Sequence, residues 1–315
     1  MLSASPLVTK TSHPAVYPTT FVEAPALSAL LGAKIIFADE TKQPTGSFKF
    51  RAACNVAAYV QQAHIIASSS GNFAQALSYA CSLMGKRCTI VMPIKSAQVK
   101  VDGIKKYGGQ IEFVDTDKKG RAVRLAELAE QNPDAYITNA YDNPLIIEGT
   151  KSLGKDIASN NEHFDYVISP IGGGGLISGI ISGIKESERT KTTVIGAEPE
   201  IANDASLSLK AGRLIANTIE PQTIADGART ISLGKHNWEI VRHNLRQIIE
   251  VPDEKIKAAV KMIYDHLQLK AEPTGALSFA AILTETKMFK NKSVCCVISG
   301  GNVDEQVFQS LIENR

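Results

Sequence analysis

The sequence lacks the features that would indicate a membrane protein or a disulfide framework. Five cysteines among 315 residues form no Cys-x-x-Cys pair, so we expect reduced, buried thiols rather than a metal or redox centre. No stretch approaches the roughly 18 apolar residues of a membrane span, and residues 1–11 lack the apolar core of a signal peptide. These absences predict a cytoplasmic protein with no membrane partner.

An excess of charge of one sign is also lacking. The 34 basic and 32 acidic residues leave a formal net charge of +2. No basic face or tail is available to neutralise a run of phosphates, so we expect no nucleic-acid partner. Hydrophobic residues make up 44% of the chain and charged residues 21%, which is typical of a globular protein whose length suits two lobes.

From about residue 64, short β-rich runs alternate with amphipathic runs of helical length, which indicates α/β architecture with mostly parallel sheets. One helix is predicted from the 3.6-residue spacing of apolar residues between Phe73 and Met84, and Gly85 is expected to end it. The predicted strands cover residues 87–92, 110–114, 166–169, 193–197 and 293–298.

The first motif is Lys-Gln-Pro-Thr-Gly-Ser-Phe-Lys-Phe-Arg at residues 42–51. Its Pro/Gly turn delivers Lys49 at the start of a helix that we expect to begin near Ser47. A partly desolvated lysine has a lowered amine pKa and can form an imine with an aldehyde. Taken alone, the segment fits a surface lysine beside a common helix cap better.

The second motif is Ala-Ser-Ser-Ser-Gly-Asn-Phe-Ala-Gln at residues 67–75, a hydroxyl-rich turn that opens a helix. The first N–H groups of a helix have no partner within the helix, so this turn could hold a carboxylate. A plain Ser or Asn helix cap is the alternative.

Two glycine-containing turns follow later in the chain. Residues 169–178 read Ser-Pro-Ile-Gly-Gly-Gly-Gly-Leu-Ile-Ser, and four successive glycines let backbone N–H groups approach a phosphate closely. A flexible hinge is the alternative, and the spacing disfavours a dinucleotide loop. Residues 297–304 place Ser299 at a strand end, where its hydroxyl could meet a ring nitrogen; a tight turn capped by Asn302 is the other interpretation. Ligands of open α/β sheets bind at the carboxyl ends of strands, so we expect these turns to converge.

In this order and at these separations, the four motifs resemble the fold-type II pyridoxal-phosphate enzymes, in the serine racemase and serine/threonine dehydratase group. The resemblance spans nearly the whole chain. It implies a tryptophan synthase β-like α/β fold with two domains, each an open, mostly parallel sheet flanked by helices. Residues 1–60 and 142–315 would form a large cofactor-binding domain and residues 61–141 a small mobile one. It also implies a homodimer.

The resemblance implies a role for each motif. Lys49 would form the imine with pyridoxal 5'-phosphate, Phe48 would pack on one face of its ring, Asn72 would bond its phenolic oxygen, and Ser299 would contact its pyridine nitrogen. The cofactor phosphate would be held by Gly172, Gly173, Gly174 and Gly175. The amino-acid substrate would be bound by Ser69, Ser70, Gly71, Asn72 and Gln75.

The segment at residues 196–204, Gly-Ala-Glu-Pro-Glu-Ile-Ala-Asn-Asp, looks like the divalent cation site of the racemase-like members. The carboxylates of Glu198 and Asp204 and the carbonyl of Ala202 would form an oxygen-only shell suited to Mg²⁺ or Ca²⁺. A solvated acidic loop is the alternative.

Two departures from the family pattern concern the substrate. The family usually continues the lysine motif with Arg-Gly-Ala, where this chain has Arg51, Ala52 and Ala53, and usually has His-Gly where this chain has Phe73 and Ala74. Both changes are expected to add bulk on the substrate side and so alter substrate choice.

The predicted activity is elimination from a small β-hydroxy amino acid such as serine, threonine or 3-hydroxyaspartate, which would make the protein a dehydratase, or ammonia-lyase. Ser70 would add racemase activity if its hydroxyl protonates the substrate face opposite Lys49. The alternatives are racemisation as the main activity, a β-replacement synthase, and a non-catalytic pyridoxal-phosphate-binding homologue. Because the chain ends soon after Ser299, no regulatory domain is expected.

Overall fold

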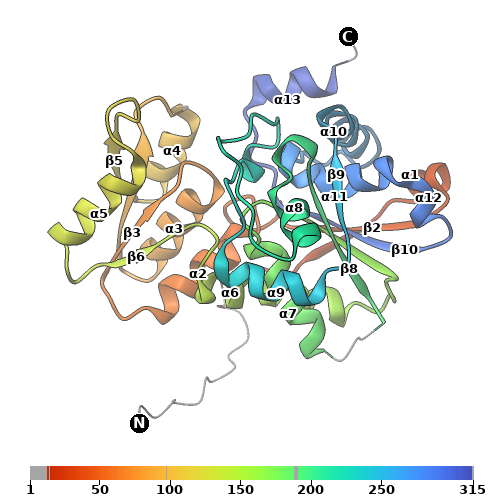
Figure 1. Ribbon diagram of the computed structural model, residues 1–315, viewed down its shortest axis with the longest axis horizontal. Coiled ribbons are helices and arrows are strands. Elements are labelled where there is room, and N and C mark those ends of the chain that lie inside the picture. Colours follow the sequence, from red (N-terminus) through yellow and green to blue (C-terminus); the bar gives the residue numbers. More distant parts are fainter. Residues whose placement is uncertain (1–12, 14, 97, 188–190, 314–315) are drawn as a thin grey trace.

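The computed structural model describes residues 13, 15–96, 98–187 and 191–313, and these form two sheets in two lobes (Figure 1). The larger sheet has the strand order β1-β2-β10-β7-β8-β9, and only β1 runs antiparallel to its neighbour. Its strands are β1 (Thr20–Glu23), β2 (Lys34–Asp39), β7 (Tyr166–Pro170), β8 (Thr193–Pro199), β9 (Ile248–Val251) and β10 (Ser293–Ile298).

The smaller sheet is entirely parallel, with the order β5-β4-β3-β6. Its strands are β3 (His64–Ser68), β4 (Arg87–Pro93), β5 (Gln110–Val114) and β6 (Tyr136–Thr138). All four lie between residues 61 and 141, the range predicted for the small domain. The division into a large domain and a small mobile one stays a prediction.

Helices cover both sheets, and α2 and α6 lie between the two lobes (Figure 1). The first seven are α1 (Pro25–Leu31), α2 (Lys49–Tyr59), α3 (Asn72–Leu83), α4 (Gln98–Lys106), α5 (Arg121–Gln131), α6 (Pro144–Ser159) and α7 (Gly175–Glu186). The others are α8 (Asp204–Ala211), α9 (Lys235–Asn244), α10 (Asp253–Leu267), α11 (Pro273–Thr284), α12 (Thr286–Phe289) and α13 (Glu305–Ile312).

The central strands of the larger sheet are buried on both faces because helices cover each side, as parallel sheets require. Strand β10 shows this directly: Cys295 packs into one hydrophobic cluster and Cys296 into another, on opposite faces. All five cysteines are free and buried, as expected. Apolar packing, rather than cross-linking, therefore holds the core together.

The fold confirms the α/β prediction, and the observed strands match the predicted ranges to within two residues. Helix α3 runs from Asn72 to Leu83, and the chain turns at Gly85 with φ +64°. Helix α2 begins at Lys49, two residues later than expected from Ser47, because the chain at Ser47 still pairs with Gly300 in an isolated β-bridge.

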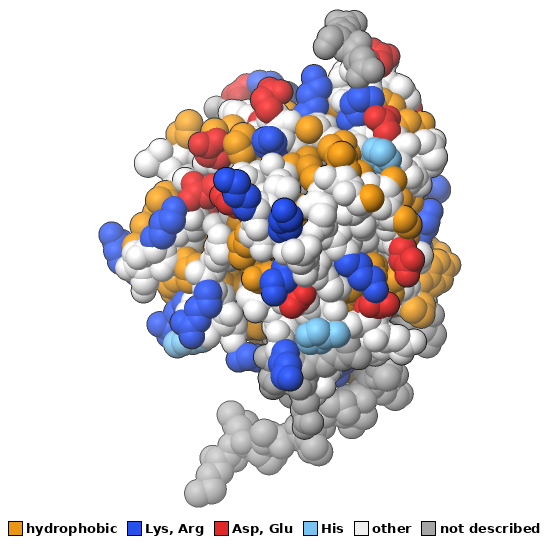
Figure 2. All heavy atoms as spheres, turned by 90° about the vertical axis from the view of Figure 1, so that its right-hand side faces the viewer, with side chains coloured by type: hydrophobic (Ala, Val, Ile, Leu, Met, Phe, Trp, Pro, Cys, Tyr) orange, Lys and Arg blue, Asp and Glu red, His pale blue; other side chains and the backbone are white. Residues whose placement is uncertain are grey.

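The surface of the larger lobe is mixed. Basic and acidic side chains both occur across the face shown in Figure 2, with hydrophobic side chains between them. No helix in the described ranges combines the length and apolar character needed to cross a membrane.

Candidate active site

The predicted turns follow the carboxyl ends of four parallel strands. The Lys49 turn follows β2, the serine loop follows β3, the glycine loop follows β7, and Ser299 follows β10. Strands β2, β10 and β7 are adjacent in the larger sheet. The Phe48 N–H donates to the Ser299 carbonyl over 2.9 Å, so the structure ties the lysine turn directly to the end of β10.

Lys49 is the first residue of α2 and its amine points into the protein. Its Nζ donates to the carbonyl of Ala140 over 2.6 Å and lies 5.0 Å from the ring centroid of Phe48 and 5.8 Å from that of Phe73. Burial lowers the pKa of the Lys49 amine to about 8, while the charge of Glu272 opposes the shift. About a tenth of the amine is therefore neutral at pH 7, far more than for an ordinary lysine, and imine formation requires the neutral amine.

The serine loop between β3 and α3 carries unpartnered backbone donors. The N-cap residue of α3 is Gly71, and no side chain caps this end of the helix. The motif therefore does not act as a plain Ser or Asn helix cap. Within the described chain, the N–H groups of Ser70, Asn72 and Phe73 donate to no protein acceptor. The loop can therefore bind an anion at a helix N-terminus. Gln75, also predicted to bind substrate, packs its side chain against the Gly103 backbone of α4.

The glycine loop has the same property at the start of α7. None of the N–H groups of its four glycines, residues 172–175, has a protein acceptor among the described residues. Gly174 has φ +90°, and a Cβ there would lie 2.8 Å from Leu233. A Cβ on Gly173 would overlap the ring of Tyr141. Only glycine fits this loop, and its free donors suit a phosphate.

Ser299 is buried beside the lysine turn, with 2% of its surface exposed. The neighbouring Ser47 hydroxyl is also buried and has no hydrogen-bond partner in the described structure. Phe73, at the start of α3, lies near the Lys49 amine, and Tyr141, next to the Ala140 that accepts from this amine, packs against the glycine loop. These contacts bring the amine, the two sets of unpartnered N–H donors and the buried hydroxyls into one region. This donor set fits a cofactor that carries an aldehyde, a phosphate and a polar aromatic ring.

The sequence reasoning missed Glu272, which precedes α11 and is 4% exposed. Its Oε1 accepts from Asn72 Nδ2 over 2.8 Å. Burial, helped by the charge of Asp226, raises the pKa of the Glu272 carboxyl to about 8. The only sequence signal is an acidic residue before Pro-Thr-Gly at residues 273–275, and this pattern is that of an ordinary helix start.

Two residues that depart from the family pattern, Phe73 and Ala52, lie in different parts of the structure. Phe73 contacts the Lys49 amine, as described above. Ala52 is buried against α6, where a Cβ on Gly149 would lie 2.9 Å from the Ala52 Cα. The Phe73 ring therefore lies near the lysine, whereas Ala52 packs between helices, and extra bulk on the substrate side stays a prediction.

The two acidic residues of the predicted cation site are both buried. Glu198, in β8, accepts from the Ser206 N–H over 2.7 Å and from the Ala205 N–H over 3.2 Å. Asp204 accepts from Asn217 over 3.1 Å, and its Oδ2 has no partner in the described structure. Burial raises the pKa of Asp204 to about 7. No group of three acidic, His or Cys side chains that could hold a metal occurs among the described residues.

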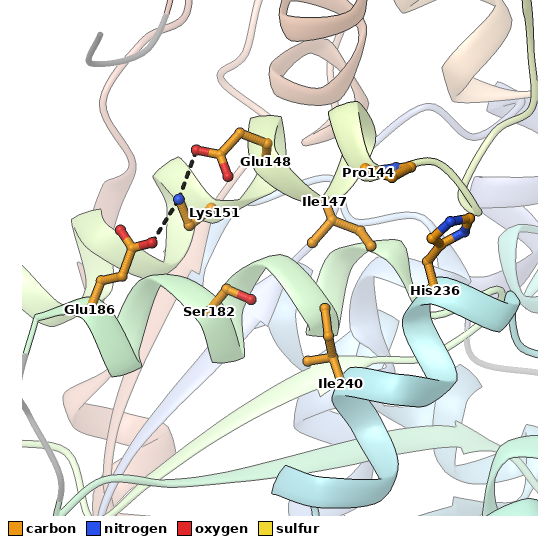
Figure 3. A pocket seen from close by; sticks show the side chains of 8 residues that line it. All are labelled: Pro144, Ile147, Glu148, Lys151, Ser182, Glu186, His236 and Ile240. Carbon is orange, nitrogen blue, oxygen red and sulfur yellow. Dashed lines mark hydrogen bonds and ion pairs between the residues drawn. The ribbon is translucent and has the colours of Figure 1, made fainter. Parts of the chain in front are cut away.

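A surface hollow of about 340 Å³ lies elsewhere, between α6, α7 and α9 (Figure 3). Lys151 crosses one end of it and pairs with Glu148 and Glu186, each over 2.7 Å. None of the predicted site residues is among those that line it. The hollow is therefore separate from the candidate active site.

Comparison with known proteins gives a consistent result. The family model "Pyridoxal-phosphate dependent enzyme" matches residues 13–300. A β-hydroxyaspartate dehydratase of Paracoccus denitrificans is 36% identical and covers 88% of each chain. A serine racemase of Schizosaccharomyces pombe is 34% identical, covering 86% of this chain and 84% of the relative.

A solved structure shows the same likeness in three dimensions. Maize serine racemase superposes with a TM-score of 0.89 at 31% identity, covering 95% of this chain and 92% of that one. The family match, the identities and the shared fold bear out the resemblance seen in the four motifs. The chain belongs to the pyridoxal-phosphate-dependent enzymes, in the serine racemase and dehydratase group of fold type II.

Proposed function

We propose that the protein is a pyridoxal-phosphate-dependent ammonia-lyase that removes water from a small β-hydroxy amino acid, with 3-hydroxyaspartate as the leading substrate. The observation that carries the proposal is the buried Lys49 amine, whose pKa is lowered to about 8 between two aromatic rings. The choice of 3-hydroxyaspartate is supported by the name of the Paracoccus denitrificans relative. Serine and threonine are the other candidates.

The cofactor would be held by residues from both lobes. Its aldehyde would bond Lys49 Nζ, its ring would lie against Phe48, and the free N–H groups of residues 172–175 would bind its phosphate. Asn72 would donate to its phenolic oxygen and Ser299 would face its pyridine nitrogen. When bound, the cofactor withdraws electrons from the α-carbon of an amino acid.

The chain's own groups then supply binding and proton transfer. The N–H groups of Ser70, Asn72 and Phe73 would bind the substrate carboxylate at the start of α3. Lys49, released from the cofactor by the substrate amine, would take the α-proton. The β-hydroxyl would leave as water with the proton that Lys49 had taken. Lys49 would then displace the unsaturated amine from the cofactor, and the amine would hydrolyse in solution to an oxo acid and ammonia.

Racemisation is a second proposed activity. The half-buried Ser70 hydroxyl makes no hydrogen bond to the described part of the chain, so it is free to exchange a proton with a ligand. If it lies on the face of the substrate opposite Lys49, it would donate its own proton to the α-carbon there after Lys49 has taken the α-proton, which inverts the centre. The Schizosaccharomyces pombe relative is named a serine racemase, which supports this role.

Three further features belong to the proposal. Glu198, Asp204 and the Ala202 carbonyl would bind Mg²⁺ or Ca²⁺, supported by the unpartnered buried Oδ2 of Asp204. The lobe of residues 61–141 would move over the substrate, supported by its separate sheet. The protein would form a homodimer, which sedimentation velocity tests directly.

The test uses the protein reconstituted with pyridoxal 5'-phosphate. Visible absorbance and oxo-acid formation are measured with the L- and D-forms of serine, threonine and 3-hydroxyaspartate. Lys49→Ala should remove both the absorbance band and the product, whereas Lys42→Ala, an exposed lysine of the same segment, should keep both. Absence of a band in the wild-type protein, or of oxo acid from every substrate, would contradict the proposal.

A further inference from the structure

The side-chain amide of Asn72 is held by two groups from the other lobe. Its Nδ2 donates to Glu272 Oε1 over 2.8 Å, and its Oδ1 accepts from Asn302 Nδ2 over 2.9 Å. Asn72 opens α3, whereas Glu272 precedes α11 and Asn302 follows β10. Each end of one amide therefore has its own partner.

The direction of this chain of hydrogen bonds is fixed by a backbone carbonyl. Asn302 Nδ2 also donates to the Thr45 carbonyl over 2.7 Å, and a carbonyl can only accept. The nitrogen of Asn302 must therefore point toward Thr45 and Asn72, so Asn72 must present its oxygen to Asn302. A rotated Asn72 amide would bring two N–H donors together at Asn302 and two acceptors together at an ionised Glu272.

We propose that Glu272 and Asn302 are positioning residues that fix the Asn72 amide so that a donor, rather than an acceptor, faces the cofactor's phenolic oxygen. The inference rests on the proposed cofactor site. Asn72 Nδ2 carries two hydrogens. One is used on Glu272 Oε1, which leaves the other for the phenolic oxygen, while the acceptor side of the amide is occupied by Asn302.

The carboxyl of Glu272 is itself held in place. Its backbone N–H donates to the Gly300 carbonyl over 3.0 Å. A Cβ on Gly300 would lie 2.8 Å from Glu272 Oε1 and 2.8 Å from Ser47 Cβ. Gly300 thus leaves room for the carboxyl between the lysine turn and the end of β10.

The amide requires an acceptor from Glu272, and the negative charge is not needed for that contact. Burial and Asp226 favour the neutral acid, while Asn72, Lys100 and Lys49 favour the ionised form. Both forms keep an oxygen that can accept from Asn72 Nδ2. Glutamine would keep such an oxygen as well, whereas methionine would not. Glu272→Gln is therefore the conservative variant and Glu272→Met the disruptive one.

The orientation matters because a donor stabilises negative charge on the phenolic oxygen and an acceptor destabilises it. In Glu272→Met the amide loses one constraint, so a rotated form becomes populated. We expect pyridoxal 5'-phosphate to bind about tenfold more weakly, the loss of roughly one hydrogen bond. The visible absorbance band should also lose intensity, with a shifted pH midpoint.

The experiment measures pyridoxal 5'-phosphate affinity by equilibrium dialysis and the absorbance spectrum between pH 6 and 9. Ser278→Ala is the matched control, because its hydroxyl is buried in α11, the helix that Glu272 precedes, and donates to the Ile168 carbonyl over 2.9 Å. Glu272→Gln and Ser278→Ala should retain the wild-type spectrum and affinity. Asn302→Leu removes the other partner of the Asn72 amide. Because Asn302 is exposed, this variant should fold and so tests the proposal even if Glu272→Met does not fold.

The outcomes separate this inference from the proposed function. A wild-type protein that takes up no cofactor overturns the proposed function. If the wild type shows a Lys49-dependent band, an unchanged spectrum in both Glu272→Met and Asn302→Leu overturns the positioning role. Equal damage in Glu272→Gln and Glu272→Met also overturns it, because the charge rather than the acceptor would then be what matters.

Discussion

Replacing Arg51 by methionine should destabilise the protein strongly, because this arginine is the counter-ion of a buried carboxylate. Its side chain is 1% exposed and that of Glu40 is 0% exposed. The guanidinium donates to both Glu40 oxygens, over 2.6 and 2.9 Å. It also donates over 2.9 Å to Asp156 and over 2.8 Å to Thr19. One side chain of α2 therefore binds α6, the residue before β1 and the residue after β2.

The expected loss follows from what remains after the change. In Arg51→Met, the Glu40 carboxylate keeps the hydrogen bond that it accepts from the Thr19 hydroxyl over 2.9 Å. Removing one partner of a buried pair costs about 3–5 kcal/mol, against a total stability of roughly 5–15 kcal/mol. Glu40→Gln combined with Arg51→Met leaves no fully buried charge unpaired, because the Asp156 side chain that also loses its partner is 30% exposed. The double variant should cost about 1–2 kcal/mol, the value of the lost hydrogen bonds.

Urea unfolding at several pH values checks this. Burial already raises the pKa of Glu40, and Arg51 opposes that shift, so the pKa of Glu40 rises further in Arg51→Met. When the pKa of an acid is higher in the folded state than in the unfolded state, ionising that acid lowers the free energy of unfolding. This loss is complete above the folded-state pKa and disappears as the pH falls and the carboxyl takes up its proton. The difference in free energy of unfolding between the wild type and Arg51→Met should therefore shrink as the pH falls from 7 to 5. A loss under about 1 kcal/mol, or a double variant worse than Arg51→Met, would refute the reasoning.

Three other predictions concern the site. Because the pKa of Lys49 is lowered to about 8, the rate of pyridoxal-phosphate uptake should rise about tenfold between pH 7 and 9 as the amine becomes neutral; stopped-flow absorbance measures it, and a flat profile contradicts it. Ser70→Ala should abolish racemisation and spare oxo-acid formation, measured by chiral chromatography; equal loss of both would assign Ser70 to substrate orientation alone. Mg²⁺ added after chelation should raise the melting temperature by a few degrees in the wild type but not in Asp204→Asn; an equal rise in both would remove Asp204 from the cation site.

The elements that the sequence predicts well are those with local patterns. Strand β10 is a continuous apolar run, buried on both faces. The glycine loop can be recognised because four successive glycines indicate a backbone that is closely packed by its neighbours. The short edge strand β1 is only partly buried along its four residues, so its pattern is too weak to identify. Its antiparallel pairing with β2 depends on tertiary contacts that periodicity does not reveal.

The hydrogen bonds between polar side chains of the site could not be predicted from the sequence, for a different reason. Asn72 and Glu272 are 200 residues apart in the chain, and neither residue carries a pattern that identifies its partner. The lysine and glycine motifs could be found because the pattern of each is complete within a few consecutive residues. The amide network could not, because its contacts arise only when the two lobes come together.

The position of β10 has a consequence for the timing of assembly. This strand is synthesised last among the strands yet pairs between β2 and β7, so β2 has a vacant side until residue 298 has left the ribosome. Until Ser299 has been synthesised, the Phe48 N–H cannot donate its hydrogen bond to the Ser299 carbonyl. Capture of the cofactor should therefore be a late event in biogenesis, and nascent chains shorter than this would display an open sheet edge to chaperones.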